Sequence, residues 1–392
     1  MSLVGSLPGG PGRLLVVDDI EANRDLLARR LRQMGHVVET AGNGREALER
    51  MRAEAFDLVL LDVMMPEMDG LEVLEELRAD DALRMIPVLM VSAVQEIESV
   101  VHCIERGATD YLPKPFNVVL LKARVESSLE KKRLRDREQL YAKSLERELE
   151  IGRNIQASFL PRVLPQPPGW EVAARLRPAR QVGGDFYDAF ELPGGALVFL
   201  LADVCDKGVG AALFMAVFRS LIRVTAERIA AAGAPRAAVV RDTIAPINEF
   251  VTKTHGDANM FATIFAAVLD PATGALAWLN AGHEPPVLRR ADGSLLRLLP
   301  TGPAVGLLPG LTFEAREERF AAGDLLLVFS DGITEARNVV GAFFGEERLL
   351  SLVAGAAPAG ALLESVDESV RAFAGDAEPS DDVSMLAVRR VP

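Results

Sequence analysis

The segment RLLVVDD, residues 13–19, is a short apolar run that ends in two acidic side chains, Asp18 and Asp19. An apolar run followed by a polar side chain returns in DLVLLD, residues 57–62, which ends in Asp62, and in PVLMVSA, residues 87–93, which reaches Ser92. Runs as uniformly apolar as these are typical of strands that helices cover on both faces. The pattern therefore predicts a parallel sheet in the first part of the chain.

Helix-forming segments separate the apolar runs. NRDLLARRLRQMG at residues 23–35 and GREALERMRAE at residues 44–54 are two of them, and strand-like segments at residues 37–40 and 109–115 complete the alternation. Strands that alternate with helices are the pattern of an α/β domain. We expect this domain to occupy residues 13–130.

Polar side chains stand at the ends of the predicted strands: Asp18, Asp19, Asp62, Ser92 and Lys114. Ligands of open parallel sheets collect at this edge. For any one acid, a solvated strand end or a helix cap is the ordinary explanation, but five matching positions favour a site. Clustered carboxylates need a cation, and an all-oxygen set favours Mg²⁺. Asp62 is the candidate nucleophile toward a phosphoryl donor, with Lys114 and Ser92 as donors to phosphoryl oxygens.

Four motifs in this region resemble those of the response-regulator receiver family: VVDD at 16–19, DVMMPEMDG at 62–70, Ser92-Ala93 and DYLPKPF at 110–116. The resemblance implies a flavodoxin-like fold with a five-stranded parallel sheet, and Asp62 as the phosphorylated residue. It also implies a Mg²⁺ ion held by Asp18, Asp19, Asp62 and the backbone carbonyl of Met64. Ser92 and Tyr111 match the family's switch positions, and the implied partner is a sensor histidine kinase or another phosphotransfer donor.

The segment from about Val118 to Leu160 is charged and helix-forming, and it is free of glycine and proline between Asn117 and Gly152. We expect one long helix, which PRVLPQPPGW at residues 161–170 ends. Its leucines recur irregularly, which permits a coiled-coil seam and a homodimer. A solvated linker helix with opposing charges is the alternative.

The second half of the chain groups its strands and helices instead of alternating them. Strand-like blocks such as GALVFLLADV and FATIFAAVLD flank helical stretches at about 208–229 and 235–254, and a further helical region runs over residues 346–373. This grouping predicts an α+β domain.

Acidic residues again stand beside strand ends: Asp185 in VGGDFYD, Asp203 in VFLLAD, Asp331 in FSDG, and the pair Asp381-Asp382. No zinc-type cluster of Cys and His accompanies them, so Mg²⁺ or Mn²⁺ is favoured over Zn²⁺. Four dispersed carboxylates are able to hold two metals that activate water for attack on a phosphate ester. Since Asp-Gly is also an ordinary turn signal, turn aspartates remain an equal alternative on pattern alone.

A set of motifs from about Glu148 onward looks like the PPM-type, protein phosphatase 2C-like serine phosphatases of bacterial sigma-factor control. They are ELEIGRNIQASFLPRVLP, RPARQVGGDFYD, ADVCDKGVGAAL, NAGHEPPVL, LVFSDGITEARN and PSDDVSML. The resemblance implies a β-sandwich flanked by helices and a phosphorylated STAS-type anti-sigma antagonist as substrate.

The same resemblance implies metal ligands at Asp185, Asp203, Asp331 and Asp381, with Asp203 bridging two Mg²⁺ or Mn²⁺ ions, assisted by the Val204 carbonyl. Asp382 is an adjacent candidate ligand, and Arg180 a candidate contact for substrate phosphate or an ordinary surface arginine. The chain departs from many relatives at two positions, where Cys205 replaces a histidine and Asp206 replaces a glycine. We interpret His283 as a structural contact rather than a catalyst.

Composition sets the remaining bounds. The chain has 392 residues, a formal net charge of −13 and two cysteines, Cys103 and Cys205. Net negative charge argues against nucleic-acid and anionic-membrane binding. We find no apolar run of the roughly 18 residues that span a membrane, and expect a cytoplasmic protein. The expected divisions are a flexible leader at 1–12, a receiver domain at 13–130, a helical linker at 131–165 and a phosphatase domain at 166–392.

The favoured hypothesis is that phosphorylation at Asp62 controls, through the long helix, a phosphatase that acts on phosphoserine or phosphothreonine of a partner protein. An alternative is a catalytically silent adaptor that sequesters a partner under receiver control. Action on a small nucleotide messenger is less favoured, since the second half contains no base-reading motif.

Overall fold

The computed structural model describes residues 10–93, 97–355 and 357–392, and it divides after Leu145 into two compact units. Of the predicted leader at residues 1–12, residues 1–9 lie outside the described residues. The division falls inside the predicted linker at 131–165, and the domain bounds drawn from the sequence stay predictions.

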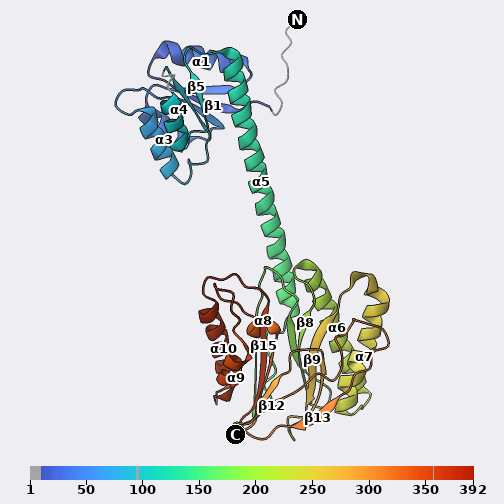
Figure 1. The fold of residues 1–392 in the computed structure, drawn as a ribbon. Helices are drawn as coiled ribbons and strands as arrows, with labels where there is room; N and C mark the ends of the chain where they lie inside the picture. The colour runs from blue at the N-terminus through green and yellow to red at the C-terminus, as the bar shows by residue number, and fades with distance from the viewer. Residues whose placement is uncertain (1–9, 94–96, 356) are drawn as a thin grey trace. The chain divides into compact units, whose positions relative to one another are not determined.

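The first unit contains a five-stranded sheet in the order β2-β1-β3-β4-β5 among the described residues, and every pairing is parallel (Figure 1). The strands are β1 (Arg13–Val17), β2 (Val37–Ala41), β3 (Leu58–Asp62), β4 (Val88–Ser92) and β5 (Asp110–Pro113). All five residues of β3 and of β4 are buried, because helices cover both faces of the sheet. The predicted flavodoxin-like sheet is confirmed.

Two hydrophobic cores lie on opposite faces of this sheet. One is formed with α1 and the start of α5, and the other with α2, α3 and α4. The helices are α1 (Glu21–Gln33), α2 (Gly44–Ala53), α3 (Gly70–Ala79), α4 (Ile97–Glu105) and α5 (Val118–Phe159). Asp69 caps α3 in a capping box with Glu72. A Cβ at Gly70 would lie 2.1 Å from the Asp62 carbonyl, so only glycine lets the helix begin this close to the strand end.

The predicted long helix is confirmed as α5, a continuous helix of 42 residues. Leu121, Val125 and Leu129 are buried in the core of the first unit. At the other end, Phe159 packs against a core of the second unit. Residues of α5 thus contribute to a core in each unit.

The second unit contains two antiparallel five-stranded sheets within the described residues, ordered β13-β10-β9-β8-β7 and β12-β11-β14-β15-β6. Their strands are β6 (Trp170–Arg177), β7 (Phe186–Glu191), β8 (Leu197–Val204), β9 (Ala262–Leu269), β10 (Ala275–Ala281), β11 (Val287–Arg289), β12 (Leu295–Arg297), β13 (Arg316–Arg319), β14 (Leu325–Phe329) and β15 (Val383–Arg390). The two sheets share a buried core that includes Phe199, Phe265 and Leu386, so they form a sandwich.

Helices cover both outer faces of the sandwich, as expected (Figure 1). Helices α6 (Val209–Ala231) and α7 (Arg236–His255) pack on one sheet, and α9 (Glu346–Ala354) and α10 (Ala359–Ala374) on the other. Two short helices, η1 (Gly256–Ala258) and α8 (Asp331–Thr334), complete the unit. The helical region expected at 346–373 is therefore two helices, with Pro358 at the N-cap of the second.

Helix α6 is long and apolar enough to cross a membrane by length and composition alone. In the fold, its stripe of Met215, Phe218 and Ile222 is buried against the sheet. Its Arg219 also forms an ion pair of 3.0 Å with the buried Asp188 of β7. These contacts are those of a core helix in a folded domain.

Candidate functional site

The receiver acids meet at the carboxyl edge of the parallel sheet. Asp18 follows β1 and Asp62 ends β3, and both are buried, while Asp19 is exposed. One carboxylate oxygen from each of the three lies within 4.8 Å of the others. Three oxygen ligands at this spacing fit a single Mg²⁺ ion. Met64 lies two residues after β3 with its side chain 69% exposed.

Lys114 reaches this group from the end of β5. Its Nζ donates to Asp18 Oδ2 at 2.7 Å and to Asp62 Oδ2 at 2.8 Å. Burial raises the pKa of Asp62, and Lys114 offsets part of that rise. Burial alone would lower the pKa of Lys114, but its two hydrogen bonds outweigh burial and raise it. The lysine therefore stays charged beside the candidate phosphorylated residue.

The predicted switch residues lie on the two neighbouring strands. Ser92 ends β4 and is 2% exposed, and the Tyr111 hydroxyl of β5 donates to the Ser92 carbonyl at 3.4 Å. The structure thus brings Asp18, Asp19, Asp62, Ser92, Tyr111 and Lys114 to one end of the sheet.

The second acidic group gathers where the two sheets of the sandwich approach each other. Asp185 directly precedes β7 and Asp203 lies near the end of β8, both in one sheet. Asp331 begins α8 just after β14, and Asp381 lies two residues before β15, both beside the other sheet. Asp185 and Asp331, which are 146 positions apart in the chain, are thus brought together by the packing of the two sheets.

The acids of this group repel one another. Burial raises the pKa of Asp185 well above its usual value, and the neighbouring Asp203 and Asp382 raise it further. Burial also raises the pKa of Asp203. Burial, Asp203 and Asp381 raise the pKa of Asp331 to about 6. Oxygen ligands that repel one another in a buried site fit divalent cations such as Mg²⁺ or Mn²⁺.

Asp382 has a different environment from its neighbour Asp381. It is 5% exposed, and its carboxylate accepts the backbone N–H groups of Ala179 at 2.8 Å and Gly184 at 2.9 Å. The N–H of Asp185 lies at 3.3 Å from the same carboxylate. Asp382 therefore holds the loop that carries Asp185, while its role as a metal ligand stays a prediction.

Three contacts around the acids were not anticipated from the sequence. The Ser384 hydroxyl donates to Asp185 Oδ2 at 2.5 Å. The side-chain amide of Gln156, near the end of α5, donates to the Gly183 carbonyl at 2.6 Å and accepts the Gly183 N–H at 3.2 Å. Lys207 Nζ lies 2.8 Å from Asp381 Oδ2. Ser384 had one usable signal, since it stands in the strand-like segment directly after the Asp381-Asp382 pair.

The remaining candidate residues are Arg180, Val204, Cys205 and His283. Arg180 is exposed in the loop before Gly183, and the Val204 carbonyl lies 2.5 Å from where a Cβ of Gly184 would stand. The Cys205 sulfur accepts the Phe261 N–H at 3.1 Å. His283 is 2% exposed and its Nδ1 lies 2.9 Å from the Thr263 hydroxyl. Burial lowers the pKa of His283 to about 3, so it is a neutral core residue.

Each of the two units contains a segment that matches a known protein family. The response regulator receiver domain model matches residues 14–126, and the Stage II sporulation protein E (SpoIIE) model matches residues 193–391. Protein IcfG of Synechocystis sp. is 38% identical over 266 residues, which cover 62% of this chain and 41% of that protein. Response regulator MprA of Mycolicibacterium vanbaalenii is 46% identical over 121 residues, which cover 30% of this chain and 51% of that protein.

The chain therefore spans about half or less of the length of these curated relatives. Among solved structures, the SiaA-PP2C domain of Pseudomonas aeruginosa matches with a TM-score of 0.54 at 20% identity. The match covers 64% of this chain and 98% of that domain, and it supports the fold. Because one family model accounts for just over half of the chain, the chain belongs to the Stage II sporulation protein E (SpoIIE) family of PP2C-type phosphatase domains, and a response regulator receiver domain precedes that domain.

Proposed function

We propose that the chain is a response regulator in which phosphorylation of Asp62 controls a metal-dependent protein phosphatase. The second unit would hydrolyse phosphoserine or phosphothreonine on a partner protein. The observation that carries the proposal is the convergence of Asp185, Asp203 and Asp331, whose pKa values are all raised by burial and mutual repulsion. A fold gains no stability from such an arrangement, whereas a cation site requires it.

In the receiver, Asp62 is the nucleophile toward a phosphoryl donor. Asp18 and Asp19, with Asp62 and the Met64 carbonyl, would hold Mg²⁺, which when bound neutralises the charge that develops on the phosphoryl oxygens. Lys114 supplies a second positive charge at hydrogen-bond distance from Asp62. Ser92, buried at the neighbouring strand end, supplies a hydroxyl donor.

In the phosphatase unit, Asp185, Asp203, Asp331 and Asp381, with the Val204 carbonyl, would hold two Mg²⁺ or Mn²⁺ ions. When bound, such a pair activates water for in-line attack on phosphorus. Ser384 donates to Asp185 Oδ2, and Asp185 lies beside Asp203. Lys207 forms an ion pair of 2.8 Å with Asp381. Arg180, in the exposed loop before Gly183, would contact the substrate phosphate.

Helix α5 is the route by which the receiver would act on the phosphatase. It is continuous from the receiver core to Gln156, which bonds to Gly183 two residues before Asp185. Its surface also exposes Leu140, Tyr141 and Leu145. These side chains would form a homodimer seam, for which a monomeric mass in light scattering of the full chain would be contrary evidence.

The proposed partners follow from the two domain types. A sensor histidine kinase or another phosphotransfer protein would supply the phosphoryl group, and a phosphorylated STAS-type anti-sigma antagonist would be the substrate, in the cytoplasm. The proposal includes no binding of nucleic acid or membrane, because the net charge is −13.

The test is hydrolysis of a generic phosphate ester and of a phosphoserine peptide with and without Mn²⁺. We expect Mn²⁺-dependent turnover that falls at least about a hundredfold in Asp203→Asn and Asp331→Asn, because each substitution removes a charged ligand. Asp292→Asn, at an exposed position between β11 and β12, is the matched charge control. Equal rates for wild type and both Asn variants would instead favour the silent adaptor.

A further inference from the structure

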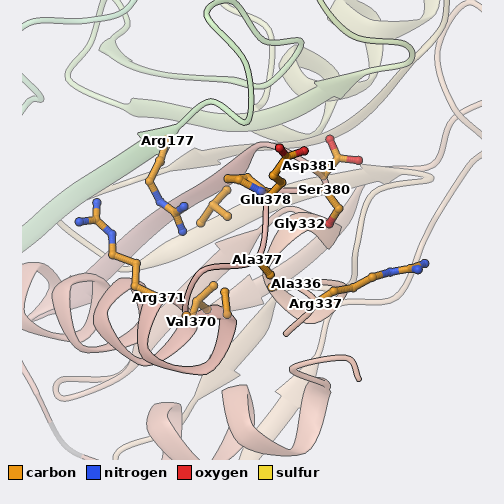
Figure 2. Close-up of a pocket in the computed structure, with 14 residues that line it drawn as sticks. Arg177, Gly332, Ala336, Arg337, Val370, Arg371, Ala377, Glu378, Ser380 and Asp381 are labelled. Atoms are coloured by element: carbon orange, nitrogen blue, oxygen red, sulfur yellow. The ribbon is translucent and has the colours of Figure 1, made fainter. Parts of the chain in front are cut away.

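A pocket of about 280 Å³ opens beside Asp381 in the second unit. Arg177 of β6 and Arg371 of α10 line one side of it, and Ser380 and Asp381 line the end nearest the acids (Figure 2). Its volume lies at the lower limit for small-molecule sites. The pocket is therefore suited to one or two side chains of a protein rather than to a cofactor.

Positive charge at this pocket exceeds what the fold needs. Asp367 of α10 is 1% exposed, and three guanidinium groups surround its carboxylate. Arg177 Nε lies at 3.1 Å, Arg371 Nη2 at 3.1 Å and Arg175 Nε at 3.2 Å. One carboxylate neutralises one of these charges. Because Arg177 and Arg371 both line the pocket, the positive charge that Asp367 does not neutralise lies at the pocket wall.

A third arginine stands at the rim. Arg337 follows α8, six residues after Asp331, and its guanidinium lies over the Phe343 ring at 4.7 Å. Within the described residues, no carboxylate lies at ion-pair distance from Arg337. Glu378 and Asp381 also line the pocket, and Lys207 pairs with Asp381. With Asp367 these are three carboxylates against five basic groups, Arg175, Arg177, Arg337, Arg371 and Lys207.

We propose that this pocket binds an acidic side chain of the phosphoprotein substrate, a few residues from the phosphorylated serine or threonine. The inference rests on the proposed phosphatase function, since it places the substrate phosphate at the acids. Asp381 belongs both to those acids and to the pocket wall, so a chain bound at one continues into the other. Carboxylates are the groups that paired guanidinium forks recognise. The pocket thus selects substrates with acidic residues near the phosphate.

The test compares two peptides that carry a non-hydrolysable phosphoserine analogue, one with glutamates beside it and one with glutamines. Binding to the full chain with Mn²⁺ is measured by fluorescence anisotropy. We expect the wild type to prefer the acidic peptide severalfold, and Arg371→Gln and Arg337→Gln each to reduce the preference roughly two- to fivefold. Arg371→Lys should retain part of it. Arg316→Gln, on the exposed strand β13, is the matched control and should retain all of it.

Two results would overturn the inference: equal or unmeasurable binding of both peptides by the wild type, or a preference that survives the double substitution Arg371→Gln and Arg337→Gln. Hydrolysis of the corresponding phosphoserine peptides by the same preparations separates the two proposals. A preference without hydrolysis counts against the phosphatase function alone. Hydrolysis without a preference counts against the pocket alone.

Discussion

At the scale of single residues, the loop that carries Asp185 is held by partners from distant parts of the chain. Asp382 accepts the Gly184 N–H, Ser384 donates to the Asp185 carboxylate and Gln156 bonds to Gly183. A Cβ at Gly183 would stand 2.0 Å from Asp382 Oδ2. The glycine therefore makes room for the carboxylate that organises the loop.

Replacing Gly183 by alanine should disrupt this loop. We expect Gly183→Ala to cost about 2 kcal/mol of unfolding free energy, the usual penalty for an overpacked site. The matching fall in Tm is roughly 4–8 °C by calorimetry. Gly210→Ala in α6 is the control, since a Cβ there meets no neighbouring atom within 4 Å and the alanine should leave the helix as stable or slightly more stable. Equal Tm values for the two variants would contradict this reading of the loop.

The buried His283 should make stability depend on pH. Its folded pKa of about 3 lies below its ordinary value of 6.5, so its contribution is present above pH 6.5 and is lost as pH falls toward 3. Relative to His283→Gln, the wild type should lose about 1.4 kcal/mol per pH unit below pH 6.5. Urea unfolding of both proteins between pH 5 and pH 8 measures this difference, and parallel pH profiles would argue against a neutral buried histidine.

Residues beside strand ends could be predicted from the sequence, whereas their supporting partners could not. Asp62 ends β3 and Lys114 follows β5 at the same edge of one parallel sheet, so the sequence pattern already implied that they meet. Asp185 and Ser384 are 199 residues apart and meet only because β15 packs across from β7. Such a contact depends on how two sheets stack, which strand patterns do not encode.

At the scale of elements, the end of α5 is the feature with the clearest consequence. Gln156 is 8% exposed and satisfies both polar groups of the Gly183 backbone. A displacement of this helix end would move the loop that carries Asp185. Gln156 is thus a positioning residue for the acidic site.

Replacing Gln156 by leucine should therefore raise the Mn²⁺ concentration needed for half-maximal activity, by about tenfold if roughly 1.4 kcal/mol of positioning is lost. Calorimetric Mn²⁺ binding should weaken in parallel. Gln166→Leu is a matched control, because Gln166 makes the same pair of bonds to Val172 on β6, away from the acids. If both variants keep the wild-type Mn²⁺ affinity, Gln156 has no positioning role.

The sequence pattern predicted which segments are helices and which are strands, but it did not predict the boundary between α9 and α10. The uniformly apolar runs became buried parallel strands, and the charged segment after Val118 became α5. The region at 346–373 divides into α9, which ends at Ala354 with Gly355 as its C-cap, and α10, which has Pro358 as its N-cap. The sequence GAAPAG at residues 355–360 carries the glycine and proline that mark such a break, which the prediction of one helical region did not take into account.

At the scale of the whole molecule, two acidic sites of opposite chemistry share one chain. Asp62 would accept a phosphoryl group, and the acids around Asp203 would activate water to remove one. Both groups could be located from the sequence because each acid stands beside the end of an apolar strand. The direction of control could not, since it depends on how α5 responds to a change in the receiver.

The most direct test of receiver control is phosphoserine peptide hydrolysis by the full chain in Mn²⁺, with and without an acyl-phosphate donor. We expect the donor to change the rate severalfold in the wild type and to leave Asp62→Ala unchanged, because the variant lacks the phosphorylated carboxylate. Asp25→Ala, at an exposed position of α1, should respond like the wild type. A wild-type rate that is the same with and without the donor, while the receiver is shown by mass spectrometry to carry phosphate, would contradict the account.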